Sequence, residues 1–197
     1  MKARWTAVGA GLCLSVALVA RAQEKKAEPP KPGPEVEKMG YFVGAWTSAG
    51  EMKQSPMGPG GPTSGRDACG WLPGKFFVAC RIETKGPMGT VEAQGIMGYD
   101  PEKKVYTWWS FNSLGEAETA TGTFQNGTWT WSSDMKMGGK TMKSRYTMSD
   151  TTPTGYAFKA ETSPDGKAWS PLMEGKVSKL ERPARAPMPM PTPTMNK

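Results

Sequence analysis

Short segments of alternating apolar and polar residues follow one another along most of this chain, separated by turns rich in Gly, Pro, Asn or Asp. Alternation with period two is typical of strands with one buried face, and no segment has the spacing of a long amphipathic helix. The pattern predicts about ten strands, at residues ~42–53, ~64–72, ~75–84, ~90–99, ~104–111, ~116–124, ~128–134, ~140–149, ~155–162 and ~168–178. Closely spaced short strands predict an all-β sandwich or closed barrel.

The clearest hairpin surrounds Asn126-Gly127, a pair that suits a tight two-residue turn. Pairing outward from this turn places Phe124 opposite Trp129 and Gly122 opposite Trp131 on one face. The other face carries only hydroxyl side chains: Thr119, Thr121, Thr123, Thr128, Thr130 and Ser132. We therefore expect the aromatic face to point inward and the hydroxyl face to point outward.

The first strand follows a segment, Glu35–Phe42, that is long enough for a short helical turn. Gly44 allows close approach of the backbone at the start of the strand, and Trp46 is a large aromatic side chain that requires burial. A Gly-x-Trp at this position is similar to the first strand of lipocalin-like barrels.

Other residues extend this resemblance, and most of them lie in turns and at barrel corners. They are Phe42-Val43-Gly44-Ala45-Trp46, Gly58-Pro59, Trp71-Leu72-Pro73-Gly74-Lys75-Phe76, Gly86-Pro87-Met88-Gly89, Gly98-Tyr99-Asp100-Pro101, Gly138-Gly139-Lys140, and Ser163-Pro164-Asp165-Gly166 with Trp169. Residues 36–180 resemble a bacterial family of lipocalin-like (calycin) domains of unknown function, distantly similar to nitrobindin. The resemblance implies an antiparallel meander β-barrel of about ten strands with a cavity, and it carries over no settled activity.

Nitrobindin-like proteins hold haem through a histidine, and this chain contains none. Haem binding of that kind is therefore not expected, and no other cofactor is predicted. The absence of histidine also excludes a Ser-His-Asp triad, a Cys-His pair and a His-based zinc site. No phosphate-binding loop or dinucleotide fingerprint occurs.

The two ends of the chain differ in composition from the strand region. Residues 1–22 have the basic start, apolar run and A-x-A site of a signal peptide, so we expect export to the periplasm or medium. Residues 23–35 are expected to form a flexible spacer, and the Pro- and Met-rich residues 181–197 a disordered tail. No membrane span is expected after cleavage, which lowers the formal charge from +7 to +4 through loss of Lys2, Arg4 and Arg21. The near-neutral barrel argues against a nucleic-acid surface.

Cys69 and Cys80 are the two thiols left after cleavage. If Pro73-Gly74 lies in a turn, Cys69 falls opposite Cys80 and Trp71 opposite Val78. Such a pair in an exported chain predicts a structural disulfide.

Two readings remain open for the charged residues of the last strands. Arg145 and Glu161 either belong to a solvent-facing ladder of opposite charges, or they lie inside the barrel. An interior Arg145 would anchor a carboxylate ligand or, with Glu161, serve a hydrolase-like enzyme. Ser163-x-Asp-Gly-x-x-Trp169 resembles part of an Asp-box, but its single copy is interpreted as a hairpin turn.

The methionines allow a further alternative, because spaced thioethers suit Cu(I). They cluster in one hairpin and in the tail, at Met135, Met137, Met142, Met188, Met190 and Met195. The corresponding hypothesis is a copper-binding or envelope-interaction protein that uses the tail.

Our main hypothesis is a non-catalytic, monomeric carrier that holds a small apolar or amphipathic molecule. The predicted ligand-binding residues are Trp46, Phe124, Trp129, Trp131, Arg145, Tyr146 and Phe158. No catalytic residue and no metal ligand is predicted.

Overall fold

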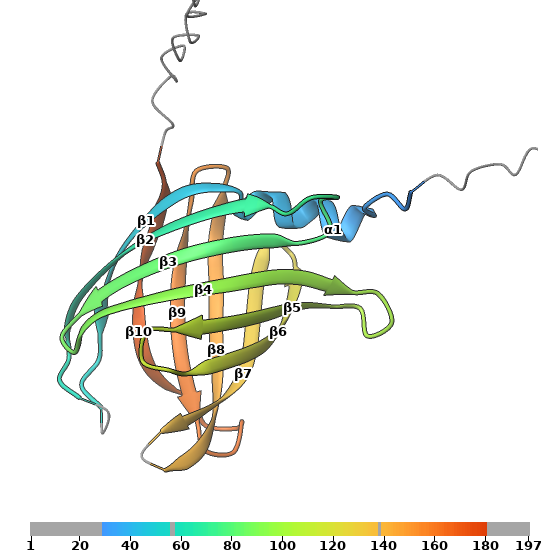
Figure 1. Cartoon of the computed structure of the whole chain (residues 1–197). Helices are drawn as coiled ribbons and strands as arrows, with labels where there is room; N and C mark the ends of the chain where they lie inside the picture. Colours follow the sequence, from blue (N-terminus) through green and yellow to red (C-terminus); the bar gives the residue numbers. More distant parts are fainter. Residues whose placement is uncertain (1–28, 56–57, 138, 181–197) are drawn as a thin grey trace, which may run out of the picture. The chain divides into compact units, whose positions relative to one another are not determined.

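The computed structural model describes residues 29–55, 58–137 and 139–180 (Figure 1). Its strands are β1 Gly44–Met52, β2 Gly61–Trp71, β3 Val78–Gly86, β4 Gly89–Asp100, β5 Val105–Asn112, β6 Ala117–Gln125, β7 Thr128–Met137, β8 Lys140–Thr152, β9 Gly155–Ser163 and β10 Ser170–Lys179. Each strand pairs antiparallel with the next, and β1 pairs with β10, so that the sheet closes into a barrel. The predicted all-β meander barrel of lipocalin-like type is confirmed.

The predicted hairpin pairings are also confirmed. Phe124 lies opposite Trp129 and Gly122 opposite Trp131, and a Cβ on Gly122 would stand 2.6 Å from the Trp131 ring. Asn126 and Gly127 both have positive φ, of 50° and 77°, as a turn with matching twist requires.

The predicted disulfide is present at the expected register. Cys69 lies directly opposite Cys80 on β2 and β3, with a Cα–Cα distance of 4.1 Å and a bond between the two sulfurs. The next inward pair along these strands is Trp71 and Val78, also as predicted. The bridge therefore ties together two neighbouring strands of one hairpin.

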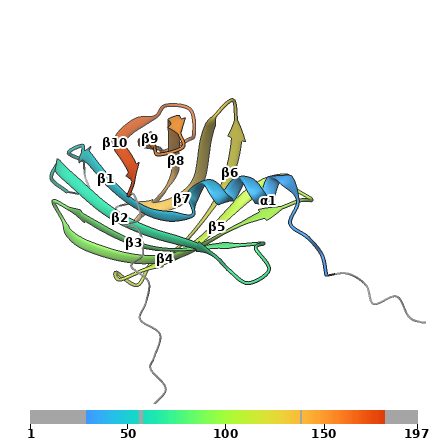
Figure 2. The same cartoon turned by 90° about the horizontal axis from the view of Figure 1, so that it is seen from above.

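One end of the barrel is closed by α1 (Pro34–Lys38) and the 3-10 helix η1 (Met39–Phe42), which precede β1. Figure 2 shows α1 running across this end. Met39 is fully buried, and Phe42 is 8% exposed. The Trp46 Nε1 donates to the Phe42 carbonyl at 2.8 Å, which fixes the entry into β1.

The helix starts one residue before the predicted helical segment Glu35–Phe42, because Pro34 is the first residue of α1. Pro is favoured in a first helical turn, where its missing N–H costs nothing. Glu35 also accepts a hydrogen bond from the Tyr106 hydroxyl at 2.8 Å, which holds α1 against the barrel.

The opposite end carries the β3–β4, β5–β6 and β9–β10 turns and no helix within the part of the chain that the structure describes. The predicted signal peptide (1–22) and tail (181–197) lie outside the described residues. No helix in residues 29–55, 58–137 and 139–180 is long and apolar enough to cross a membrane.

Candidate functional site

The inner face of the barrel changes in character between its two ends. Near the helix-closed end, the inward positions carry large side chains: Val78, Met97, Tyr106, Phe124, Trp129 and Met148. Near the open end, the same strands turn small side chains inward: Gly65, Thr84, Ala93, Ser110, Ser133 and Ser144. On these strands the largest inward side chains therefore lie near the helix-closed end, followed by smaller ones and then by Met135 and Met142 towards the rim.

Trp129 is the centre of the filled half and is 2% exposed. Its ring centroid lies 5.0 Å from Phe42, 4.6 Å from Tyr106 and 4.7 Å from Phe124. Trp131 stacks beside it at 6.2 Å. These contacts make Trp129 part of the core, with the partly buried Phe124 packed against it.

A second aromatic cluster lies on the wall made by β1, β8, β9 and β10. Trp46 and Phe158 are buried in it, and the Phe158 ring stacks on Tyr146 at 5.6 Å. Tyr156 packs 5.9 Å from Trp46. Of the predicted ligand-binding residues, the structure therefore brings Trp46, Tyr146 and Phe158 together on this wall.

Asp67 faces this cluster from β2. Its cross-strand neighbours are Trp46 on β1 and Ile82 on β3. Burial raises the pKa of its carboxyl to about 6. Its charge in turn helps to raise the pKa values of Tyr146 and Tyr156, although burial is the larger cause for both. Among the described residues, no cation or hydrogen-bond donor is paired with the Asp67 carboxylate.

The side chains of Asp67, Tyr146 and Tyr156 point inward yet stay only half-buried. Within a closed barrel, such accessible surface faces interior space. Burial is the largest cause of the raised pKa values of all three groups. We name Asp67, Tyr146 and Tyr156 the interior polar cluster.

Arg145 does not belong to the interior. Tyr146 faces inward, so its neighbour Arg145 points outward, where its Nη2 lies 2.6 Å from Glu161 Oε2. Lys159 contacts the other Glu161 oxygen at 2.7 Å, and the Arg145 guanidinium lies 4.2 Å from the Trp169 ring centroid. The interior placement of Arg145 and Glu161 is therefore wrong, and the solvent-side charge ladder is the observed arrangement.

Glu161 is also a poor general acid in this setting. Hydrogen bonds from Lys159 and then Arg145 lower the pKa of its carboxyl, although its side chain is only 8% exposed. It is held as a carboxylate by two cations, which is the arrangement of a structural ion pair. The hydrolase-like hypothesis loses its proposed pair of residues.

Asp67 was not among the predicted site residues, although the alternation along its strand contained the signal. Cys69 and Trp71 were expected to share one face of a hairpin, and alternation along the same strand places Asp67 on that face as well. A carboxylate at an inward position between apolar residues is itself unusual.

Met135 lies opposite Met142 near the open end, and the described residues contain no group of three His, Cys, Asp or Glu that could hold a metal.

Comparisons with known proteins agree with the fold and leave the function open. The model of a family described as "Protein of unknown function (DUF1579)" matches residues 31–179. The crystal structure of Rv2717c from M. tuberculosis is similar with a TM-score of 0.53 at 10% identity, covering 76% of this chain and 99% of that one. The S-type phycobiliprotein lyase CPES from Guillardia theta gives a TM-score of 0.52 at 8% identity, covering 75% and 92% of the two chains. No curated protein matches the sequence significantly.

Proposed function

We propose that this chain, which belongs to the DUF1579 family, binds one small amphipathic molecule inside the open half of its barrel without transforming it. The observation that carries the proposal is the interior polar cluster: an unpaired, half-buried carboxyl on β2 whose charge acts on Tyr146 and Tyr156. The S-type phycobiliprotein lyase CPES has a similar fold at 8% identity, and this likeness supports the barrel architecture alone.

The chemistry of the cluster indicates the kind of ligand. The wall of Trp46, Tyr146 and Phe158 suits an apolar body, since burying apolar surface contributes about 25 cal/mol per Å². Asp67 suits a positively charged or hydrogen-bond-donating group, because an unpaired carboxylate in a low dielectric gains most from a cation. We therefore propose a hydrophobic amine or a similar amphipathic cation, held with about micromolar affinity.

The Cys69–Cys80 disulfide supports the further proposal that the protein is exported, because such bridges persist in oxidising compartments. A carrier outside the cytoplasm needs no covalent chemistry to be useful.

The direct test combines native mass spectrometry with titration. The protein is purified gently from its own host, and a bound mass released by denaturation identifies the ligand class. The apo protein is then titrated at pH 7.5 with dodecylamine, dodecanol and dodecanoate, and tryptophan fluorescence is followed.

Under the proposal, the amine binds most tightly, and Asp67→Asn weakens it by about tenfold while the alcohol is little affected. Asp134→Asn is the matched control, because Asp134 is an exposed carboxylate paired with Lys143 on the outer face. Equal affinities for the three probes, or equal effects of the two variants, would show that Asp67 does not recognise the ligand.

One observation favours a second candidate function. A carboxyl whose pKa lies at about 6 can exchange a proton near neutral pH, so Asp67 has the pKa of a general acid or base. In that case the molecule recovered from the barrel would be converted on incubation with the wild-type protein and stay unchanged with Asp67→Asn, as followed by NMR.

A further inference from the structure

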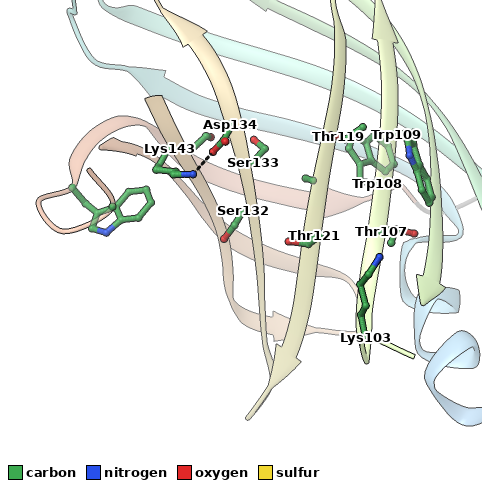
Figure 3. A pocket seen from close by; sticks show the side chains of 14 residues that line it. Lys103, Thr107, Trp108, Trp109, Thr119, Thr121, Ser132, Ser133, Asp134 and Lys143 are labelled. Atoms are coloured by element: carbon green, nitrogen blue, oxygen red, sulfur yellow. Dashed lines mark hydrogen bonds and ion pairs between the residues drawn. The ribbon is translucent and has the colours of Figure 1, made fainter. Parts of the chain in front are cut away.

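The outer face of β5, β6, β7 and β8 carries an open groove of about 710 Å³, separate from the interior polar cluster (Figure 3). Thr107 of β5 lies opposite Thr121 of β6, and Thr121 lies opposite Ser132 of β7. One row nearer the open end, Trp109 lies opposite Thr119. The floor of the groove is therefore a sheet surface of short hydroxyl side chains.

An indole stands at each side of this floor. Trp109 points outward from β5 and is 43% exposed. Its neighbour Trp108 points inward and packs against the core. Trp169 lines the opposite side, over β8, where Arg145 lies 4.2 Å from its ring. Three strand spacings separate β5 from β8, so the indoles are on the order of 14 Å apart.

Trp169 is positioned by the turn between β9 and β10. Ser163 is fully buried and its Oγ accepts from the Gly166 N–H at 2.8 Å, while Asp165 Oδ1 accepts from the Lys167 N–H at 2.9 Å. Gly166 has a φ of 79°, which an L side chain rarely adopts. The Ser-x-Asp-Gly motif thus builds a rigid turn that presents Trp169 at the groove.

The charges around the groove cancel one another. Lys143 Nζ lies 2.8 Å from Asp134 Oδ1, and Lys103 Nζ lies 3.3 Å from Asp100 Oδ2. Beside the floor, Arg145 is paired with Glu161. The groove therefore offers hydroxyls and indoles with little net charge, which disfavours a nucleic acid or a strongly ionic ligand.

We infer that this groove binds a neutral polyhydroxylated ligand, a short oligosaccharide. The apolar C–H face of a sugar ring packs on an indole, whose electron-rich face attracts the slightly positive C–H groups. Its hydroxyls both donate and accept, as do those of Thr107, Thr121 and Ser132. An extended, uncharged chain that reaches both indoles matches the length, the lining and the charge of the groove.

The test titrates the full chain with soluble fragments of cellulose, chitin and starch, followed by calorimetry and by NMR shifts of the indole N–H signals. At least one of these glycans binds, and Trp109→Ala and Trp169→Ala each weaken it by about tenfold. Phe111→Ala is the matched control, because Phe111 is a 67% exposed aromatic side chain on β5 that does not line the groove. It leaves the affinity within about twofold.

Trp169→Ala removes a contact of Arg145, so Thr121→Val provides a second variant that keeps the shape of an exposed strand position and deletes one hydroxyl. It weakens glycan binding by several-fold under the proposal, with an unchanged thermal transition. The inference is overturned if none of the three glycans binds at about 10 mM, a very weak limit. It is overturned equally if Trp109→Ala and Phe111→Ala have the same effect.

Discussion

At the scale of single residues, the most informative position is Asp67, where an ionisable group is kept in the interior without a partner. Burial raises its pKa to about 6, from an ordinary value of 3.8. A raised carboxyl pKa means that the folded state holds a proton more tightly than the unfolded state. Stability is therefore lost as pH rises from about 4 to about 6, and it is not regained above that range.

Asp67→Asn should abolish this loss, because the amide has the same shape and no charge. We expect the variant to be more stable than the wild type at pH 7 by roughly 1–3 kcal/mol, and about equally stable at pH 3.5. Urea unfolding at several pH values measures the difference. A stability difference between the two proteins that does not change between pH 4 and 6 would contradict the assignment of the pKa shift to burial.

Glycines show how single residues shape the inner face. A Cβ on Gly95 would overlap the ring of Trp108, so this glycine provides the space that an inward tryptophan occupies. Gly122 does the same for Trp131, and that pairing was predicted from the sequence because a two-residue turn sets its register. The contact between Gly95 and Trp108 was not predicted, because it is diagonal: Gly95 lies opposite Ser110 and Trp108 opposite Met97.

At the scale of elements, the short helical entry decides which end of the barrel is closed. α1 and η1 contain nine residues, too few to be stable alone, so their structure depends on packing against the barrel. Phe42 supplies much of that packing through Trp129, and the Glu35–Tyr106 hydrogen bond secures the start of α1.

Phe42→Ala should therefore reduce the free energy of unfolding by about 3–5 kcal/mol, as expected for truncation of a buried Phe. Phe111→Ala, at an exposed strand position, should change it by less than about 0.5 kcal/mol. Urea denaturation of both variants provides the comparison. If the two losses were similar, the entry helix would not be packed as the structure shows.

At the scale of the whole molecule, the barrel wall separates two proposed sites. The interior polar cluster lies on the inner face, and the groove between Trp109 and Trp169 lies on the outer face of β5 to β8, so β8 borders both sites. The strands β5 to β8 pair in continuous register without a bulge. Strong coupling between two sites requires an element with two discrete arrangements, and a continuous strand ladder does not by itself supply one.

We therefore expect the sites to act independently. Trp109→Ala should leave the affinity for dodecylamine within about twofold, and Asp67→Asn should leave glycan binding equally unchanged. Calorimetry with one ligand in the presence and absence of the other measures the coupling. A reciprocal change of more than about fivefold would reveal a conformational link that the structure does not show.

The sequence by itself determined the features that depend on local geometry: the succession of strands, the Asn126-Gly127 hairpin and the Cys69–Cys80 pairing. Alternation with period two and well-defined turns carry this information, because both act between residues that are near in the chain. Alternation also placed Tyr146 and its neighbour Arg145 on opposite faces of one strand. It could not show which of the two faces lies inside the barrel.

Only the tertiary structure decided the rest. Trp109 on β5 and Trp169 over β8 flank one groove, although three strand spacings separate them. Asp67 of β2 likewise faces Tyr146 and Tyr156, which lie on β8 and β9. These neighbourhoods arise from closure of β1 on β10 and from the curvature of the wall. Both depend on the summed stagger of ten strands, a quantity that no single segment specifies.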